Sequence, residues 1–339
     1  MTLIRALILL AVSVFALQAA KPLDVYLIDV EGGKCVLVIS PSGQSLLYDA
    51  GWPGQGGRDN KRIVEAAKAA GLKQIDYLVI SHYDVDHLGD VPALMALFPV
   101  KHIIDNGSLQ TPGADFERRY KPFAEARDAI PHSVIPVGEK VPIKGVDVTV
   151  VSAGTKTLSS PLPGAGQPNP ACGGTAAKPE IKSNHEDNMS IGLLFTLGKF
   201  KMLDLADLEA FYSYKLACPT NLIGTVDVYN VAVHAQEKGI SGVLEPTLHA
   251  RVFLVGNGPR KGGDPASWPV LRGVPDVEDI WQAHYSVLGG KDKNPPDDFI
   301  ANLDENCQGK WLKLSAKTDG SFTITNSRND FSKTYKARK

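Results

Sequence analysis

The sequence lacks the features that mark a nucleic-acid-binding, membrane-spanning or disulfide-rich protein. Its 36 Lys and Arg are balanced by 37 Asp and Glu, so no global field draws in nucleic acid or an acidic partner. Beyond residue 20, no apolar run approaches the roughly 20 residues of a membrane-spanning helix. Only 4 cysteines occur, and none has zinc-knuckle spacing. What remains is an ordinary globular composition, with 43% hydrophobic and 22% charged residues.

The N-terminus has the pattern of a secretory signal. A positive segment, Met1 to Arg5, precedes the apolar run Ala6 to Leu17 and the small residues around Ala19 and Ala20. An uncleaved anchor is the alternative, but the run is shorter than the roughly 20 residues that span a bilayer. We therefore expect a signal peptide over residues 1–20 and a periplasmic or secreted mature protein that does not contact a membrane.

The cysteines are Cys35, Cys172, Cys218 and Cys307. In an oxidising compartment they permit two bridges, with three possible connectivities. Cys35 lies in a predicted strand, where a cysteine serves as a small core residue. We expect one bridge among the other three.

Hydrophobic periodicity and turn residues predict a chain that alternates strands with helices. Strands are predicted at 23–29, 35–39, 45–48, 75–80, 101–104, 146–152, 190–196, 200–205, 226–233, 251–255, 311–315 and 321–325. Helices are predicted at 58–70, 92–98, 112–129 and 276–285. Two similar halves of this kind favour a mixed α/β (α+β) sandwich of two sheets with helices outside. The stretch 153–184, rich in Pro and Gly, is interpreted as either a lid or a plain mobile excursion.

A cluster of polar residues follows the buried strand that ends at Ile80. His82, Asp84, Asp86 and His87 fall within six residues, and burying such groups is costly unless a cation or another partner compensates them. Carboxylates and imidazoles also follow other predicted strands, at Asp49, Asp207 and His234. Any one of these residues alone is explained as a satisfied polar loop residue. Together they have the composition of a two-metal hydrolytic site.

These residues resemble the motifs of the metallo-β-lactamase superfamily. The family motif H-x-H-x-D-H corresponds here to His82-Tyr83-Asp84-Val85-Asp86-His87. Asp49-Ala50-Gly51, Leu205-Ala206-Asp207 and His234 resemble its remaining strand-end motifs. The resemblance implies a single four-layer αββα domain over residues 21–339. It is closest to the nuclease-like branch of DNA-uptake competence proteins, through residues 27–33, 81–89 and 188–193.

The same resemblance implies a role for each motif residue. The implied metal ligands are His82, Asp84, Asp86, His87, Asp207 and His234. His82 and Asp84 hold the first metal, Asp207 bridges, and Asp86 also acts as the catalytic residue that orients a metal-bound hydroxide. The implied cofactors are two divalent metal ions, with zinc expected and manganese possible. Because Asp84 replaces the usual histidine, the first site is richer in oxygen and tolerates manganese better.

Three further positions are candidates where the family pattern is interrupted. The place of a central histidine ligand is filled by His185, by Glu186 or by neither, and Asp264 is the candidate for the place of a late histidine. Asp49 is expected to fix a ligand rather than bind metal itself.

Two basic clusters have separate interpretations. Arg260 and Lys261 lie among glycines beyond a strand end, where they form either an anion cradle for the substrate or a solvated turn. Lys333, Lys336, Arg338 and Lys339 are interpreted as a solvated tail rather than a nucleic-acid patch, because few aromatic residues lie near them.

The pattern as a whole favours an exported metal-dependent hydrolase that uses a metal-bound hydroxide. The expected substrate is a phosphodiester or a carboxylic ester or amide, and the 256–263 loop inclines the choice towards phosphodiesters. The alternative is a catalytically weak or inactive binding protein on the same fold, because the site has fewer histidines than the family pattern. Nothing in the sequence indicates the oligomeric state.

Overall fold

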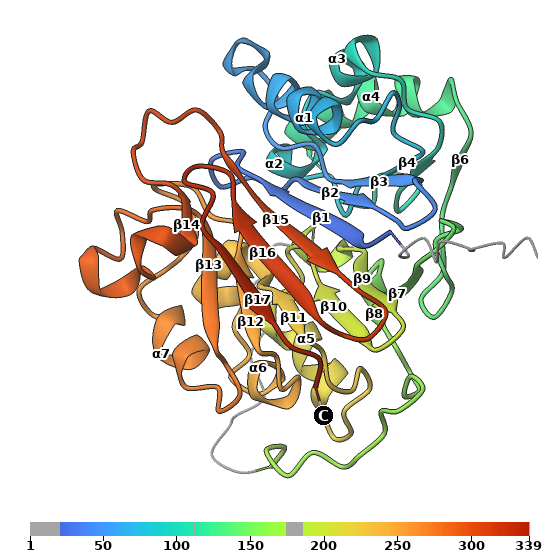
Figure 1. The fold of residues 1–339 in the computed structure, drawn as a ribbon. Helices are drawn as coiled ribbons and strands as arrows, with labels where there is room; N and C mark the ends of the chain where they lie inside the picture. The colour runs from blue at the N-terminus through green and yellow to red at the C-terminus, as the bar shows by residue number, and fades with distance from the viewer. Residues whose placement is uncertain (1–20, 112, 174–185, 339) are drawn as a thin grey trace, which may run out of the picture.

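The computed structural model describes residues 21–111, 113–173 and 186–338, which form two large sheets packed face to face with helices outside (Figure 1). The chain segment of the expected signal peptide lies outside these residues. None of the helices in these residues combines the length and the apolar character that a bilayer-spanning segment needs.

The first sheet has nine strands in the order β17-β16-β15-β1-β2-β3-β4-β5-β6. An antiparallel meander, as expected, is formed by β1 (Leu23–Ile28), β2 (Val36–Ile39) and β3 (Ser45–Tyr48). The parallel strands β4 (Tyr77–Val79), β5 (Ile103–Ile104) and β6 (His132–Ser133) extend it on one side. On the other side lie β15 (Trp311–Ala316), β16 (Phe322–Asn326) and β17 (Ser332–Tyr335).

The second sheet has eight strands in the order β14-β13-β12-β11-β10-β9-β7-β8. Its antiparallel part contains β7 (Asp147–Ala153), β8 (Lys156–Thr157), β9 (Gly192–Leu197) and β10 (Phe200–Asp204). From β10 onward the pairing is parallel, through β11 (Val228–Asn230), β12 (Val252–Val255), β13 (Asp279–His284) and β14 (Ile300–Asn302).

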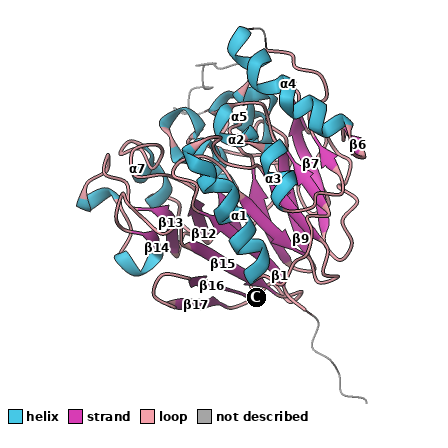
Figure 2. Ribbon diagram, turned by 90° about the horizontal axis from the view of Figure 1, so that it is seen from above, coloured by secondary structure: helices cyan, strands magenta, loops and turns pink. Residues whose placement is uncertain are grey.

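Three apolar clusters hold four layers together. One lies between the sheets and includes Val38 and Phe195. A second packs the first sheet against α1 (Arg58–Ala69), α3 (Val91–Leu97) and α4 (Ala114–Asp128), which lie over it when the molecule is seen from above (Figure 2). The third packs the second sheet against α5 (Ala210–Ala217), α6 (Leu244–Thr247) and α7 (Ser267–Arg272). The expected αββα sandwich is confirmed.

Two local expectations are wrong. Residues 276–285 contain strand β13 rather than a helix, because both of its faces are covered and every residue from Ile280 to His284 is buried. The C-terminal segment is more than a solvated tail, because β17 pairs with β16. Its cations also have partners within the fold: Lys333 lies 2.5 Å from Asp279 and Arg338 lies 3.3 Å from Asp227.

The expected single bridge joins Cys172 to Cys218, while Cys35 is a buried core residue and Cys307 is free. The bridge attaches the described part of the 153–184 stretch to the end of α5. Asn169 adds hydrogen bonds from the same stretch to Ala217 O and to Thr247 Oγ1. Residues 153–173 are therefore fastened to the helical face of the second sheet.

Candidate metal centre

The functional residues lie where strands of the two sheets end. The motif follows β4, with Asp86 and His87 on the short helix α2 (Val85–Leu88). Asp207 follows β10 and His234 lies just after β11. His234 has a φ of 55°, in the left-handed region that costs energy for a residue other than glycine. The fold maintains this strained turn, which aims the His234 ring at the other site residues.

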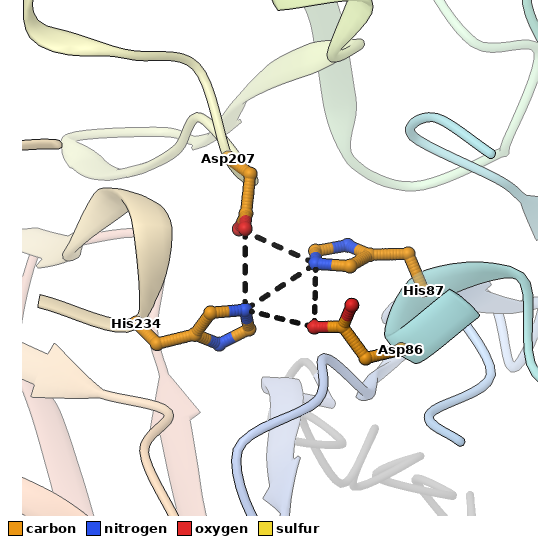
Figure 3. A group of neighbouring side chains, drawn as sticks. All are labelled: Asp86, His87, Asp207 and His234. Atoms are coloured by element: carbon orange, nitrogen blue, oxygen red, sulfur yellow. Dashed lines mark hydrogen bonds and ion pairs between the residues drawn. The ribbon is translucent and has the colours of Figure 1, made fainter. Parts of the chain in front are cut away.

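Asp86, His87, Asp207 and His234 meet around one point (Figure 3). His87 Nε2 lies 3.4 Å from Asp86 Oδ2 and 3.3 Å from Asp207 Oδ1. His234 Nε2 lies 3.3 Å from Asp86 Oδ2 and 3.3 Å from Asp207 Oδ2. Two ligand atoms that each lie about 2.1 Å from a tetrahedral cation are about 3.4 Å apart, so these spacings fit a shared cation.

Hydrogen bonds of the outer ring nitrogens fix the tautomer and the orientation of both imidazoles. His87 Nδ1 donates to Asp49 Oδ2 at 2.9 Å, and His234 Nδ1 donates to the Gly256 carbonyl at 3.0 Å. In their neutral forms both rings then carry the lone pair on Nε2, and these two atoms face each other at 3.3 Å. Two opposed lone pairs repel, so either a proton or a cation must lie between them.

A second group forms beside the first from His82, Asp187 and Asp207. His82 is fully buried, and its Nε2 has no hydrogen-bond partner among the described residues. The nearest carboxylate oxygens, from Asp84 and Asp187, lie 3.8 Å away, beyond hydrogen-bond range. Asp207 belongs to both groups, so this one carboxylate lies between the two sets of ligand-type atoms.

Asp187 is the residue that the sequence analysis missed. Glu186, one of the two candidates for this position, turns away: it accepts from the Tyr83 backbone N–H at 2.7 Å and from the Thr111 hydroxyl. The other candidate, His185, lies outside the described residues. A 3-10 turn over Asp187–Met189 brings Asp187 towards His82. The signal was present in the sequence, since Asp187 is the carboxylate nearest to the Asn188–Ser190 strand approach.

Asp49 lies behind the His87 ring, on the side away from Asp86, Asp207 and His234. It is fully buried, and its two oxygens accept from the Ser81 backbone N–H and hydroxyl, both at 2.7 Å, in addition to His87. Ser81 Oγ also lies 3.0 Å from His82 Nδ1. One carboxylate therefore orients both imidazoles, directly for His87 and through Ser81 for His82.

The buried carboxylates and imidazoles of the centre shift one another's pKa values. Burial opposes ionisation of Asp207 and Asp86, but the neighbouring imidazoles outweigh it and hold both pKa values well below the usual range. Burial also opposes charge on His87, yet Asp207, Asp86 and Asp49 raise its pKa well above 6.5. Burial and the charge of Asp207 raise the pKa of Asp187 to about 7. Without a cation, a proton on His87 balances part of the negative charge.

Three basic side chains border the centre. Lys261 contacts Asp86, Lys238 contacts Asp187, and the Arg119 guanidinium lies 4.0 Å from Asp84. All three are partly exposed, so they form a positive rim between the carboxylates and solvent. We call Lys261, Lys238 and Arg119 the basic rim.

Two other candidates do not join the centre. Arg260 points to the surface and pairs with Glu305 at 2.8 Å, so only Lys261 of this pair reaches the site. Asp264 accepts from the Glu237 backbone N–H at 3.2 Å and is not part of either ligand group. The glycines between them have a steric role: a Cβ at Gly262, where φ is 79°, would collide with the His234 carbonyl.

Comparison with known families identifies the segment that carries the motif. Residues 28–168 match the sequence model described as the metallo-beta-lactamase superfamily. This segment has the superfamily's sequence pattern. The match confirms the resemblance for this segment, which includes the His82–His87 motif, and members of the superfamily are typically metal-dependent hydrolases. The narrower resemblance to the competence branch stays a prediction. A comparison with curated proteins gives no match.

Solved structures are similar at low identity. The metallo-beta-lactamase fold protein YhfI from Bacillus subtilis is 14% identical with a TM-score of 0.46, and the alignment covers 77% of this chain and 96% of that one. Igni18, a metallo hydrolase from Ignicoccus hospitalis, is 11% identical with a TM-score of 0.43, covering 76% and 94%.

Proposed function

We propose that the protein is a hydrolase that uses two divalent cations bridged by Asp207. The observation that carries the proposal is that two ligand groups share this one carboxylate. The donor atoms suit such ions: His82 Nε2 is buried without a hydrogen-bond partner among the described residues, and the four atoms around His87 have cation-like spacing. His82, Asp84 and Asp187 would hold one cation, and Asp86, His87 and His234 the other.

When bound, a pair of cations polarises the scissile group and makes a water acidic enough to attack at neutral pH. The chain supplies the rest of the chemistry. Asp49 and Ser81 hold the imidazoles with their Nε2 atoms inward. Asp86, at the rim side of its group, accepts a hydrogen bond from Lys261 and is placed to orient the attacking water.

The donor sets of the two halves differ, which supports different metal preferences. Around His82 there is one nitrogen among carboxylates, a composition that suits manganese as well as zinc. Around His87 there are two imidazoles and two carboxylates, which suits zinc. We therefore infer zinc in the His87 half and either ion in the His82 half.

A phosphodiester is the substrate class that the rim supports best. Lys261 and Lys238 each contact a site carboxylate, and Arg119 lies near a third, so an arriving anion meets three positive side chains beside the carboxylates. A neutral ester or amide carries no charge for these three cations to attract before reaction. Arg260 serves as a matched control for Lys261, because it is adjacent in sequence but paired away from the site.

The competing proposal is a binding protein without strong catalysis. Its support is that Lys261 and Lys238 already neutralise Asp86 and Asp187, so the site is charge-balanced with fewer metal ions. Export also remains a proposal, supported by the Cys172–Cys218 bridge, because disulfides persist mainly in oxidising compartments.

One experiment separates the two proposals. Purified protein is supplied with zinc or manganese and tested on generic phosphodiester, ester, lactone and β-lactam substrates, with His87→Ala as a control. The hydrolase proposal expects phosphodiester turnover that His87→Ala abolishes and that Lys261→Ala reduces several-fold, while Arg260→Ala leaves it unchanged. Activity that survives His87→Ala would refute the site, and folded protein with no turnover under either metal would favour the binding protein.

A further inference from the structure

A second group of ligand-type side chains lies outside the Asp207 centre. Asp29, His284 and Cys307 each place one ligand atom within 4.8 Å of the other two. Asp29 follows β1, His284 ends β13, and Cys307 lies between β14 and β15. Asp29 and His284 are fully buried, and Cys307 is half-buried. None of the three has a role in the proposed hydrolysis.

The His284 ring is arranged as a ligand without a partner. Its Nδ1 donates to the Tyr285 carbonyl at 3.0 Å, which leaves the lone pair of the neutral ring on Nε2. This Nε2 is buried and has no hydrogen-bond partner within the described residues. A buried lone pair without a donor loses its interaction with water and gains nothing in return. A cation between His284 and the other two residues would satisfy it.

The other two donors already converge. Cys307 Sγ lies 3.2 Å from Asp29 Oδ2, and a carboxylate, a thiolate and an imidazole are together a zinc-type ligand set. In the absence of metal the contact is a thiol donating to a carboxylate. That simpler arrangement accounts for Asp29 and Cys307, but it leaves His284 Nε2 unexplained.

Neighbouring charges allow a dication here. Arg62 donates to Cys307 Sγ at 3.3 Å and to Glu31 Oε1 at 3.1 Å. Glu31 also pairs with Arg58, which pairs in turn with Asp59, so the two arginines are balanced by two carboxylates outside the ligand set. One carboxylate and one thiolate then neutralise a divalent ion, and the Arg62 N–H stabilises the thiolate from the side, as groups behind metal ligands do. A surface pocket that includes Glu31, Arg62 and Cys307 gives access from solvent.

We propose that Asp29, His284 and Cys307 form a second, separate metal site that binds a thiophilic divalent cation of the zinc type. Three protein ligands leave a fourth position for water from the pocket. The site joins the ends of β1, β13 and the β14–β15 loop. It also supports the turn that follows Asp29, whose Gly33 packs against the Asp86 backbone carbonyl. The proposed role is therefore to stabilise one wall of the catalytic centre.

The test uses cobalt(II) as a spectroscopic substitute for zinc in the full-length protein. The Asp207 centre contains no cysteine, so a thiolate-to-cobalt charge-transfer band reports the second site alone. We expect the band in the unmodified protein and in Asp207→Ala, with about one equivalent of cobalt retained by the latter. Cys307→Ser should remove the band, and His284→Gln should weaken cobalt binding more than about 10-fold. Cys35→Ala, which removes the other free thiol, is the matched control and should keep it.

Thiol labelling keeps the proposal testable if a variant fails to fold. In the unmodified protein, zinc should protect Cys307 from alkylation, and a chelator should restore the reaction. The proposal is overturned if cobalt gives no charge-transfer band, or if Cys307 alkylates equally fast with and without zinc. It is also overturned if Cys307 is found in an intermolecular disulfide. None of these outcomes depends on hydrolytic activity, so failure of the hydrolase proposal would be seen separately.

Discussion

The two halves of the Asp207 centre are built to different degrees of rigidity. Around His87, both imidazoles have their outer nitrogens tied, one to Asp49 and the other to the Gly256 carbonyl. Around His82, a single imidazole faces carboxylates that are also engaged by cations at the rim. In this centre the imidazole rings are held by hydrogen bonds to their outer nitrogens, whereas the carboxylates pair with the basic rim on the solvent side. The His87 half therefore has two imidazoles held directly, whereas the His82 half has one imidazole, held through Ser81, and more of its ligand atoms are carboxylates beside the rim.

The largest effect is expected from removing the residue that the halves share. Asp207→Ala takes a ligand from both cations, so we expect metal affinity and hydrolysis to fall by more than about 100-fold. Elemental analysis after dialysis and turnover of a phosphodiester measure the two losses. Loss of only one equivalent from the Asp207 centre would show that Asp207 serves a single half.

The next effect tests the rigidity of the His87 half. Asp49→Asn keeps the size of the side chain but removes the charge that holds the His87 ring, so we expect metal affinity to fall about 10- to 100-fold. Competition with a chelator of known affinity measures it. Asp90→Asn is a suitable control, because Asp90 only caps α3 by accepting from Ala93 N at 3.2 Å. Equal losses in the two variants would contradict the assigned role.

The response to pH should also separate metal-free from metal-bound protein. The folded pKa of His87 is raised, so its charge stabilises the metal-free fold fully below about 6.5, and this contribution is lost as pH rises through the folded value. The lowered pKa values of Asp86 and Asp207 contribute above about 3.8 and are lost as pH falls through the folded values.

Zinc must expel the His87 proton, so its affinity should rise by up to about tenfold per pH unit while one proton is released. Asp187 adds to this trend, because its pKa of about 7 means that it ionises near neutrality. The increase in Tm on adding zinc should therefore grow between pH 6 and pH 8 on this account. A zinc-induced shift that is independent of pH would indicate that no proton is displaced.

The smallest expected effect concerns the donor atoms, of which the His82 half has fewer nitrogens than the His87 half. Asp187→His gives the His82 half a second nitrogen, so we expect its preference to move from manganese towards zinc by about tenfold. Binding titrations with each metal measure the ratio, and Glu186→Gln is the control, because Glu186 bonds to Tyr83 and Thr111 instead. An unchanged ratio would place Asp187 outside the ligand set.

The sequence predicts the fold and the positions of the motif residues better than it predicts local structure and side-chain directions. The strand-end positions of Asp49, Asp207 and His234 follow from local apolar runs, and the structure brings all three to the motif. Strand β13 was misread because a strand covered on both faces shows no alternation. Asp187 was missed because its direction depends on a 3-10 turn rather than on any period. Arg260 and Lys261 are neighbours in sequence, and only tertiary packing decides which one faces Asp86.

The position of Asp207 between two ligand groups also links their occupancies. If binding of the first ion changes the binding free energy of the second by some amount, then binding of the second ion changes that of the first by the same amount. Repulsion between the ions acts against joint loading, whereas ordering of the shared carboxylate by one ion favours the other. On the two-cation proposal, the affinity of each half would therefore depend on whether the other half is occupied, through one shared coupling free energy.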